Sequence, residues 1–148
     1  MRLRQVCFNE RFVMSTRSLI SDEAASPDIL EVFNDIRKTR DSDFINNFWR
    51  ALAHDPAQLK AVWNDLKNIM ADSETSEIDP LTKEMIYIAV STANGCSYCI
   101  HSHTAAAKAK GMSEAQHNEL LAIIGMAGKT NHLVTALQVP VDDVFKAE

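Results

Sequence analysis

The dipeptide Asn94-Gly95 constrains the fold of this chain more than any other short stretch, because it ends one helix and lets another begin at once. Glycine is common just beyond a helix end because it adopts the left-handed conformation without a steric penalty, and asparagine tolerates that conformation too. We therefore expect one helix to end at Gly95 and the next to begin at about Cys96. If the two helices pack antiparallel, side chains of the first will face side chains of the second.

Three side chains that carry chemistry share one face of the second expected helix. Cys99 follows Cys96 by three residues and precedes His103 by four, and these spacings place all three on one side of a helix. The free backbone N–H groups at a helix N-terminus stabilise a thiolate, and a lowered thiol pKa makes a cysteine reactive near neutral pH. Two cysteines at this spacing can also close into a disulfide, and a histidine can accept or return a proton.

A carboxylate on the preceding helix completes the candidate site. Glu84 directly precedes the apolar run from Met85 to Val90, where a charge is unusual. Antiparallel packing of the two helices would bring Glu84 to His103, either directly or through a water molecule. The sequence therefore predicts a site made of Glu84, Cys96, Cys99 and His103.

The spacing of these four residues resembles the active-site signature of the AhpD-like alkylhydroperoxidases, which belong to the carboxymuconolactone decarboxylase superfamily. In this chain the signature reads Glu84, eleven residues, Cys96-x-x-Cys99-x-x-x-His103, and the resemblance extends over roughly residues 44–137. It implies that Glu84 and His103 relay protons. It also implies that the Cys99 thiolate attacks the peroxide and that Cys96 resolves the oxidised sulfur.

The same resemblance implies an activity and a set of partners. The expected protein is a thiol-dependent peroxidase that reduces hydroperoxides and is then reduced by an external dithiol, with no metal, haem or flavin cofactor. The family's helical fold assembles as a trimer or a larger ring such as a hexamer, so we expect a homo-oligomer. Some members carry a histidine just before the second cysteine, but this chain has Tyr98 there, which packs over the expected site.

Other interpretations of the same residues stay open. The cysteines are alternatively buried structural thiols or part of a zinc site, although zinc needs four ligands and His101 lies on a different side of the helix from Cys96. A c-type haem is disfavoured because Ile100, not histidine, follows Cys99. As a whole, the chain is alternatively a lactone decarboxylase that uses acid–base residues only, or a non-enzymatic redox sensor. The cysteine pair argues against the decarboxylase, since superfamily members with that chemistry generally lack it.

The rest of the chain predicts an all-α fold of about six helices in a single domain. Three helix starts are marked by a capping residue before a proline, and a capping box marks the last: Ser26-Pro27, Asp55-Pro56, Asp79-Pro80, and Ser113 with Gln116. We expect helices from Pro27, from about Ser42, over 56–70, over 80–94, over 96–110, and from Ser113 toward Pro140. The domain would span 26–138, with an N-terminal arm or tail at 1–25 and a tail at 139–148.

Burial is predicted from the periodicity of apolar residues. The helix over 80–94 is apolar almost all round, so we expect it to be central and buried. The aromatic residues Phe44 and Phe48 are expected to point inward. Gly125 and Gly128 lie within the last helix, where each costs about 1 kcal/mol relative to alanine, and we expect them to be points of close approach at a subunit contact.

Charge and cysteine content limit the partners and the location. The net charge of −5 argues against a nucleic-acid partner, which needs a basic surface. We find no apolar run near the ~20 residues that cross a bilayer, so no membrane contact is expected. The odd count of three cysteines, with no evident mate for Cys7, suits a reducing compartment. No secretory signal is recognisable at the N-terminus, and we expect a cytoplasmic protein.

Overall fold

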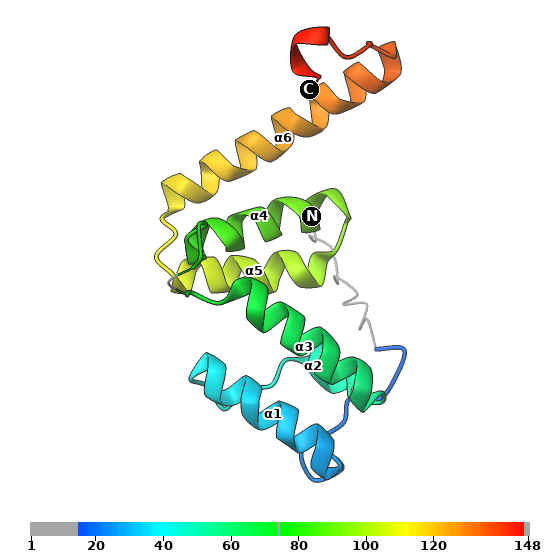
Figure 1. Cartoon of the computed structure of the whole chain (residues 1–148), viewed down its shortest axis with the longest axis vertical. Coiled ribbons are helices and arrows are strands. Elements are labelled where there is room, and N and C mark those ends of the chain that lie inside the picture. Colours follow the sequence, from blue (N-terminus) through cyan, green and yellow to red (C-terminus); the bar gives the residue numbers. More distant parts are fainter. Residues whose placement is uncertain (1–14, 74, 147–148) are drawn as a thin grey trace, which may run out of the picture. The chain divides into compact units, whose positions relative to one another are not determined.

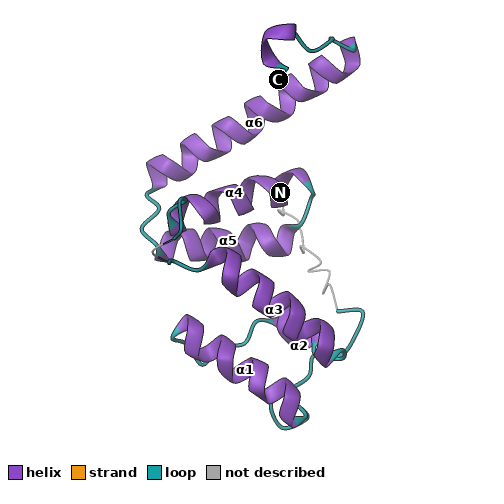
Figure 2. Ribbon diagram, viewed as in Figure 1, coloured by secondary structure: helices purple, strands orange, loops and turns teal. Residues whose placement is uncertain are grey.

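The computed structural model describes residues 15–73 and 75–146, and within these residues it contains helices but no strand (Figures 1 and 2). The predicted all-α fold of about six helices is confirmed. The helices are α1 (Pro27–Arg40), α2 (Asn47–Leu52), α3 (Pro56–Met70), α4 (Pro80–Ala93), α5 (Ser97–Ala109), α6 (Glu114–Leu137) and the short 3₁₀ helix η1 (Asp143–Phe145).

The chain divides into two compact units, Met1–Ile69 and Met70–Glu148. The single domain predicted over 26–138 spans the boundary between them. Of the predicted N-terminal arm, residues 1–14 (which include Cys7) lie outside the described residues, as do residues 147 and 148 of the predicted C-terminal tail.

The described part of the predicted N-terminal arm is tied to the first unit. The N–H of Ile20 donates to the carbonyl of Arg50 over 3.2 Å, and Ile20 packs against the core of that unit. The Asp22 carboxylate pairs with Arg37, and its second oxygen lies 2.9 Å from Arg50 Nη2. Residues 20–22 are therefore part of the packed structure.

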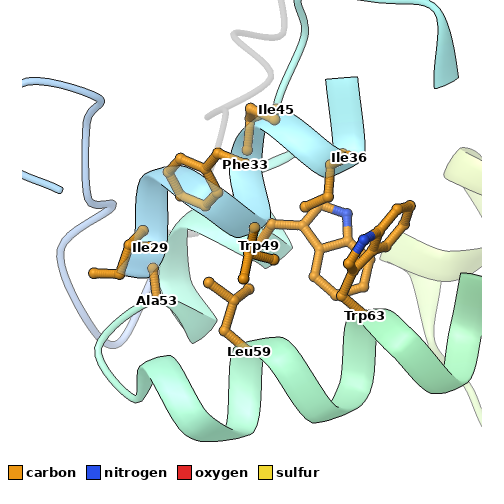
Figure 3. Close-up of a cluster of buried hydrophobic side chains, with 9 residues drawn as sticks. Ile29, Phe33, Ile36, Ile45, Trp49, Ala53, Leu59 and Trp63 are labelled. Carbon is orange, nitrogen blue, oxygen red and sulfur yellow. The ribbon is translucent and has the colours of Figure 1, made fainter. Parts of the chain in front are cut away.

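The core of the first unit is built around two tryptophans, Trp49 of α2 and Trp63 of α3 (Figure 3). Their rings meet edge to face, with centroids 5.5 Å apart and planes at 82°, a favourable geometry for aromatic pairs. The indole N–H of Trp63 donates to Asp35 over 2.6 Å, so the buried polar atom has a partner. Seven other buried side chains complete the cluster: Ile29, Val32, Phe33, Ile36, Ile45, Ala53 and Leu59.

The inward orientation predicted for Phe44 and Phe48 is wrong in the single chain, where they are 68% and 45% exposed. The predicted helix from Ser42 begins only at Asn47. Before it, the N–H of Phe44 donates to the hydroxyl of Ser42 over 3.2 Å, a local bond of the kind that competes with helix formation. With no helix there, Ile45 alone of residues 42–46 is buried.

In the second unit, α4 and α5 form the predicted helical hairpin, which Gly95 closes with a left-handed φ of +67°. The N–H of Cys96 donates to the carbonyl of Ser91 over 2.9 Å, and the N–H of Gly95 donates to Thr92 over 3.1 Å. These two bonds are those of a Schellman motif. They anchor the backbone of Cys96 to the end of α4, and α5 starts one residue later at Ser97.

The hairpin buries only one face of α4. Glu84, Ile88 and Ser91 are buried, whereas Ile86 and Val90 are 48% and 53% exposed, so the prediction of a helix buried all round is wrong in the single chain. The core of this unit is a small cluster of three buried side chains with four others packed on it. Its members are Ile88, Ala107 and Met112, with Leu81, Met85, Leu120 and Ile124 around them.

Helix α6 opens with the predicted capping box, in which the Ser113 hydroxyl accepts from the N–H of Gln116 and the Gln116 side chain accepts from the N–H of Ser113. None of its 24 residues is buried. Among the described helices it alone is long and apolar enough to cross a membrane, contrary to our expectation that no stretch comes near this. This finding rests on length and composition only, and is weak evidence of a membrane span.

The two glycines inside α6 do not make the expected close approach within the chain. Apart from the glycine, its two chain neighbours and the adjacent backbone of α6, no atom lies within 4 Å of the point where a Cβ would stand on Gly125 or Gly128. A subunit contact at these positions therefore stays a prediction.

We predict that Gly95→Ala lowers the free energy of unfolding by about 1 kcal/mol, because an L side chain is disfavoured at positive φ. No neighbouring atom lies within 4 Å of the added Cβ, so the cost is conformational. Chemical denaturation of the reduced protein measures it. Gly95→Asn is the matched control and should cost less, because asparagine tolerates this conformation. Equal losses in both variants would show that the left-handed turn is not the reason.

Candidate active site

A hydrogen bond between α4 and α5 lies at the centre of the candidate site. His103 Nδ1 and Glu84 Oε2 are 2.6 Å apart, and the Glu84 side chain is only 6% exposed. An ionised carboxylate only accepts hydrogen bonds, so Nδ1 carries the proton and donates it. In the neutral imidazole, Nε2 is then the free base. Of the two arrangements expected for Glu84 and His103, direct or through a water molecule, the structure has the direct contact.

The charge on Glu84 is maintained by its partners. Burial is the largest effect and raises the pKa of Glu84, but the hydrogen bonds from His103 and Lys110, followed by the positive charge of Lys110, outweigh it. The net pKa lies below the usual value for glutamate. Glu84 is therefore ionised at neutral pH although it is buried.

Tyr87 of α4 packs against the face of the His103 imidazole. Its ring stacks on His103 with centroids 3.7 Å apart and planes at 18°. Burial first, and then the negative charges of Cys99, Cys96 and Glu84, raise the pKa of Tyr87. The phenol therefore lies within electrostatic range of both thiols and of the carboxylate, and it stays neutral at physiological pH.

The two cysteines are free, half-buried and hydrogen-bonded to each other. The thiol of Cys99 donates to Cys96, and this bond, with the backbone N–H groups of Cys99 and Tyr98, lowers the pKa of Cys96. Burial, followed by the bond and charge of Cys96, raises the pKa of Cys99 to about 11. The resting thiolate is thus favoured on Cys96, the reverse of the order that the family resemblance implies for an attacking Cys99 thiolate.

Two residues weighed in the sequence lie at the edge of the site. His101 is exposed, and its Nδ1 donates to the carbonyl of Ser97 over 2.8 Å, consistent with its predicted orientation away from His103. Tyr98 is 44% exposed. In the described part of the chain, no cluster of three or more His, Cys, Asp or Glu side chains is arranged to hold a metal ion.

The sequence analysis missed two members of the site, Tyr87 and Lys110. Lys110 Nζ lies 3.1 Å from Oε1 of Glu84, the carboxylate oxygen that His103 does not use. Both residues were signalled by helical spacing. Tyr87 follows Glu84 by three residues, and Lys110 follows His103 by seven, which is two turns on the same face.

Comparison with known proteins identifies the group to which this hairpin belongs. The sequence profile of the Carboxymuconolactone decarboxylase family matches residues 57–142, more than half of the chain. The chain belongs to the carboxymuconolactone decarboxylase family. No curated protein matches it. A solved structure described as the alkylhydroperoxidase AhpD core from Rhodospirillum rubrum is 58% identical, with a TM-score of 0.87.

The family match extends from the start of α3 to the residues after α6, so it includes the whole hairpin of the site. The AhpD core structure matches 91% of this chain, and the chain covers 99% of that structure. The predicted resemblance to AhpD-like members of the carboxymuconolactone decarboxylase family is thereby confirmed.

We predict that Cys96 is alkylated before Cys99 when the reduced protein meets limiting iodoacetamide at about pH 7. The lowered pKa of Cys96 gives it the larger thiolate fraction, and the thiolate is the nucleophile. Peptide mass mapping reads each site. In Cys99→Ala the side-chain donor to Cys96 is lost, so labelling of Cys96 at this pH should slow. Faster labelling of Cys99 than of Cys96 in the native chain would contradict the assigned order.

Proposed function

We propose that the protein is an alkylhydroperoxidase-type peroxidase that reduces hydroperoxides through a dithiol–disulfide cycle of Cys96 and Cys99. The observation that carries this proposal is the junction of α4 and α5, where two hydrogen-bonded thiols begin the helix whose next turn bears a histidine paired with a buried carboxylate. The solved relative described as an alkylhydroperoxidase supports it.

The proposed cycle begins with proton transfer to His103. Neutral His103, oriented through Nδ1 by Glu84, takes the Cys96 proton on Nε2, directly or through a water molecule. The Cys96 thiolate then accepts the proton of Cys99 as the Cys99 sulfur attacks the outer peroxide oxygen. The O–O bond breaks, and the leaving alkoxide takes a proton from His103, which gives an alcohol and a sulfenic acid on Cys99.

The second half of the cycle forms and then reduces the disulfide. The Cys96 thiol displaces the hydroxyl of the Cys99 sulfenic acid, which forms the S–S bond and releases water. The dithiol has then lost two electrons to the peroxide. An external dithiol returns them by thiol–disulfide exchange, and no metal, haem or flavin takes part.

We predict that a slight excess of an alkyl hydroperoxide removes two hydrogen atoms from the reduced protein, seen by intact mass, and abolishes both free thiols of the pair. In Cys96→Ser a sulfenic acid should accumulate on Cys99 and be trapped by dimedone. In Cys99→Ser the oxidation rate should fall by at least about tenfold. Sulfenic acid on Cys96 in Cys99→Ser would reverse the two roles. No mass change in the native protein would rule out the peroxidase and favour an acid–base enzyme of the same family.

We further propose that the chain functions as a homo-oligomer, a trimer or a hexamer, in which a second copy covers the outer face of α6. Met126, Leu133 and Leu137 of this face are 59%, 52% and 73% exposed. On the other side of the helix, Leu120 and Ile124 pack against the hairpin core. Gly125 and Gly128 have open space beside them, which leaves room for a second backbone.

A second copy suits this helix better than a bilayer. Lys129 lies between Met126 and Leu133 on the outer side of α6, and a charge at mid-membrane costs roughly 3 kcal/mol. At a protein interface the lysine stem packs while its ammonium group reaches solvent. We therefore propose that the protein makes no membrane contact. A cytoplasmic location and the absence of a nucleic-acid partner are proposed as the sequence predicts them.

We predict that Leu133→Glu lowers the molar mass measured by light scattering to that of a smaller assembly, because the carboxylate would be buried at the contact. Leu133 is exposed in the single chain, so the change should leave the helix content unchanged. Thr135→Glu is the matched control, because position 135 lies about 200° further round the helix. An unchanged mass for Leu133→Glu, or binding of the native protein to phospholipid vesicles, would refute this assembly.

A further inference from the structure

The Glu84 carboxylate is shared between two side chains, His103 of α5 and Lys110 at the C-cap of that helix. Oε2 accepts from His103 Nδ1 over 2.6 Å, while Oε1 lies 3.1 Å from the ammonium nitrogen of Lys110. The Glu84 side chain is 6% exposed and the Lys110 side chain 39%. The ion pair thus connects a buried carboxylate to a lysine at the surface.

The position of Lys110 follows from where α5 ends. Lys110 is the C-cap residue, and its N–H bonds back to the carbonyl of Ala106 over 3.0 Å. Gly111 then adopts a left-handed φ of +92° and turns the chain away. Because Lys110 is two helical turns beyond His103, both face α4. The cation also lies at the negative end of the helix dipole, which favours it there.

The positive charge of Lys110 determines whether the Glu84 carboxylate favours a second proton on the His103 imidazole. A buried carboxylate without a compensating charge is costly, and it relieves that cost by acquiring a proton. A neutral histidine donates a hydrogen bond but brings no net charge. Lys110 brings a full positive charge, so the group of Glu84, neutral His103 and Lys110 is neutral overall. Without Lys110, the pair of Glu84 and His103 would draw in an extra proton.

We propose that Lys110 is a positioning residue for proton transfer, whose permanent charge balances the Glu84 carboxylate and so keeps His103 neutral and able to accept a proton from the thiols. The proposal rests on the proposed function for its catalytic consequence. The charge balance itself exists in the reduced protein without any peroxide.

The ionisable groups around Glu84 are few in the described part of the chain. Its ionisable hydrogen-bond partners there are His103 of α5 and Lys110, the C-cap residue of that helix, and Tyr87 of α4 lies within electrostatic range. The thiols of Cys96 and Cys99 begin the same face of α5. From α6, Glu114 pairs with Lys108 over 3.0 Å. Lys108 pairs with Glu114 rather than with Glu84, so its replacement is a matched control on the same helix.

The direct test is an NMR titration of the His103 imidazole in the reduced protein, with the resonance assigned by its loss in His103→Gln. In Lys110→Met the imidazole should hold its proton to higher pH, and the midpoint should move up by about one unit, a shift that allows for the partial exposure of the lysine. Lys108→Met should leave the midpoint in place, and Lys110→Arg should restore it. A midpoint in Lys110→Met within about 0.2 units of the native protein would overturn the proposal.

A double variant keeps the test independent of any general disturbance of the fold. With Glu84→Gln already present, no carboxylate remains for Lys110 to balance, so adding Lys110→Met should cause a much smaller shift. A shift of equal size in both backgrounds would show that Lys110 does not act through Glu84. Lys110→Gln is the second variant, and it should reproduce the result with a polar side chain in place of methionine.

Activity gives the remaining readout and separates this proposal from the peroxidase proposal. The acidic limb of the pH profile for disulfide formation should move up by the same amount in Lys110→Met, with a smaller effect on the plateau at high pH. A plain structural defect would lower the plateau without moving the limb. If the native protein does not reduce peroxide but the His103 titration still shifts, the peroxidase proposal fails while the role of Lys110 stands.

Discussion

The 2.6 Å hydrogen bond between Glu84 and His103 is the interaction on which the rest of this site depends. It joins a buried carboxylate on α4 to an imidazole on α5, and a charge in that position is tolerated only when it is paired. The bond determines which imidazole nitrogen is free, and the stacked ring of Tyr87 then limits the orientation of the imidazole. The lysine at the end of α5 compensates the charge that the histidine alone would leave unbalanced. Four side chains from two helices thus form one electrostatic unit.

Much of this arrangement was predictable because it is local in sequence. The glycine stop at Gly95 and the spacing of Cys96, Cys99 and His103 define the hairpin and its reactive face through backbone geometry alone. The contact between Glu84 and His103 required only that two helices joined by a short turn pack antiparallel. Tyr87 and Lys110 were within reach of the same reasoning, since each lies at helical spacing from a predicted site residue.

The features that escaped prediction depend on packing rather than on periodicity. Phe44 and Phe48 read as core residues, but the backbone before Asn47 forms no helix, which turns Phe44 outward. The apolar sequence of α4 suggested burial on all sides, whereas one chain alone supplies neighbours for only one face. The order of thiol acidity was also out of reach. It depends on which sulfur donates and how deeply each is buried, and spacing treats the two cysteines alike.

That order of acidity has a structural origin in the turn that opens α5. Cys96 is the N-cap residue, where free N–H groups of the first turn stabilise negative charge, while Cys99 lies within that turn and loses more solvent. A negative charge on Cys96 makes ionisation of Cys99 harder, so the pair holds one shared proton rather than losing two. The proton of Cys99 then has an acceptor already in contact with it. An attacking Cys99 does not need to be a thiolate at rest, because its proton moves to Cys96 over an existing hydrogen bond. All of these groups belong to one hairpin, and Glu84 is only 5% exposed in the single chain, so this balance of charges does not require a second copy.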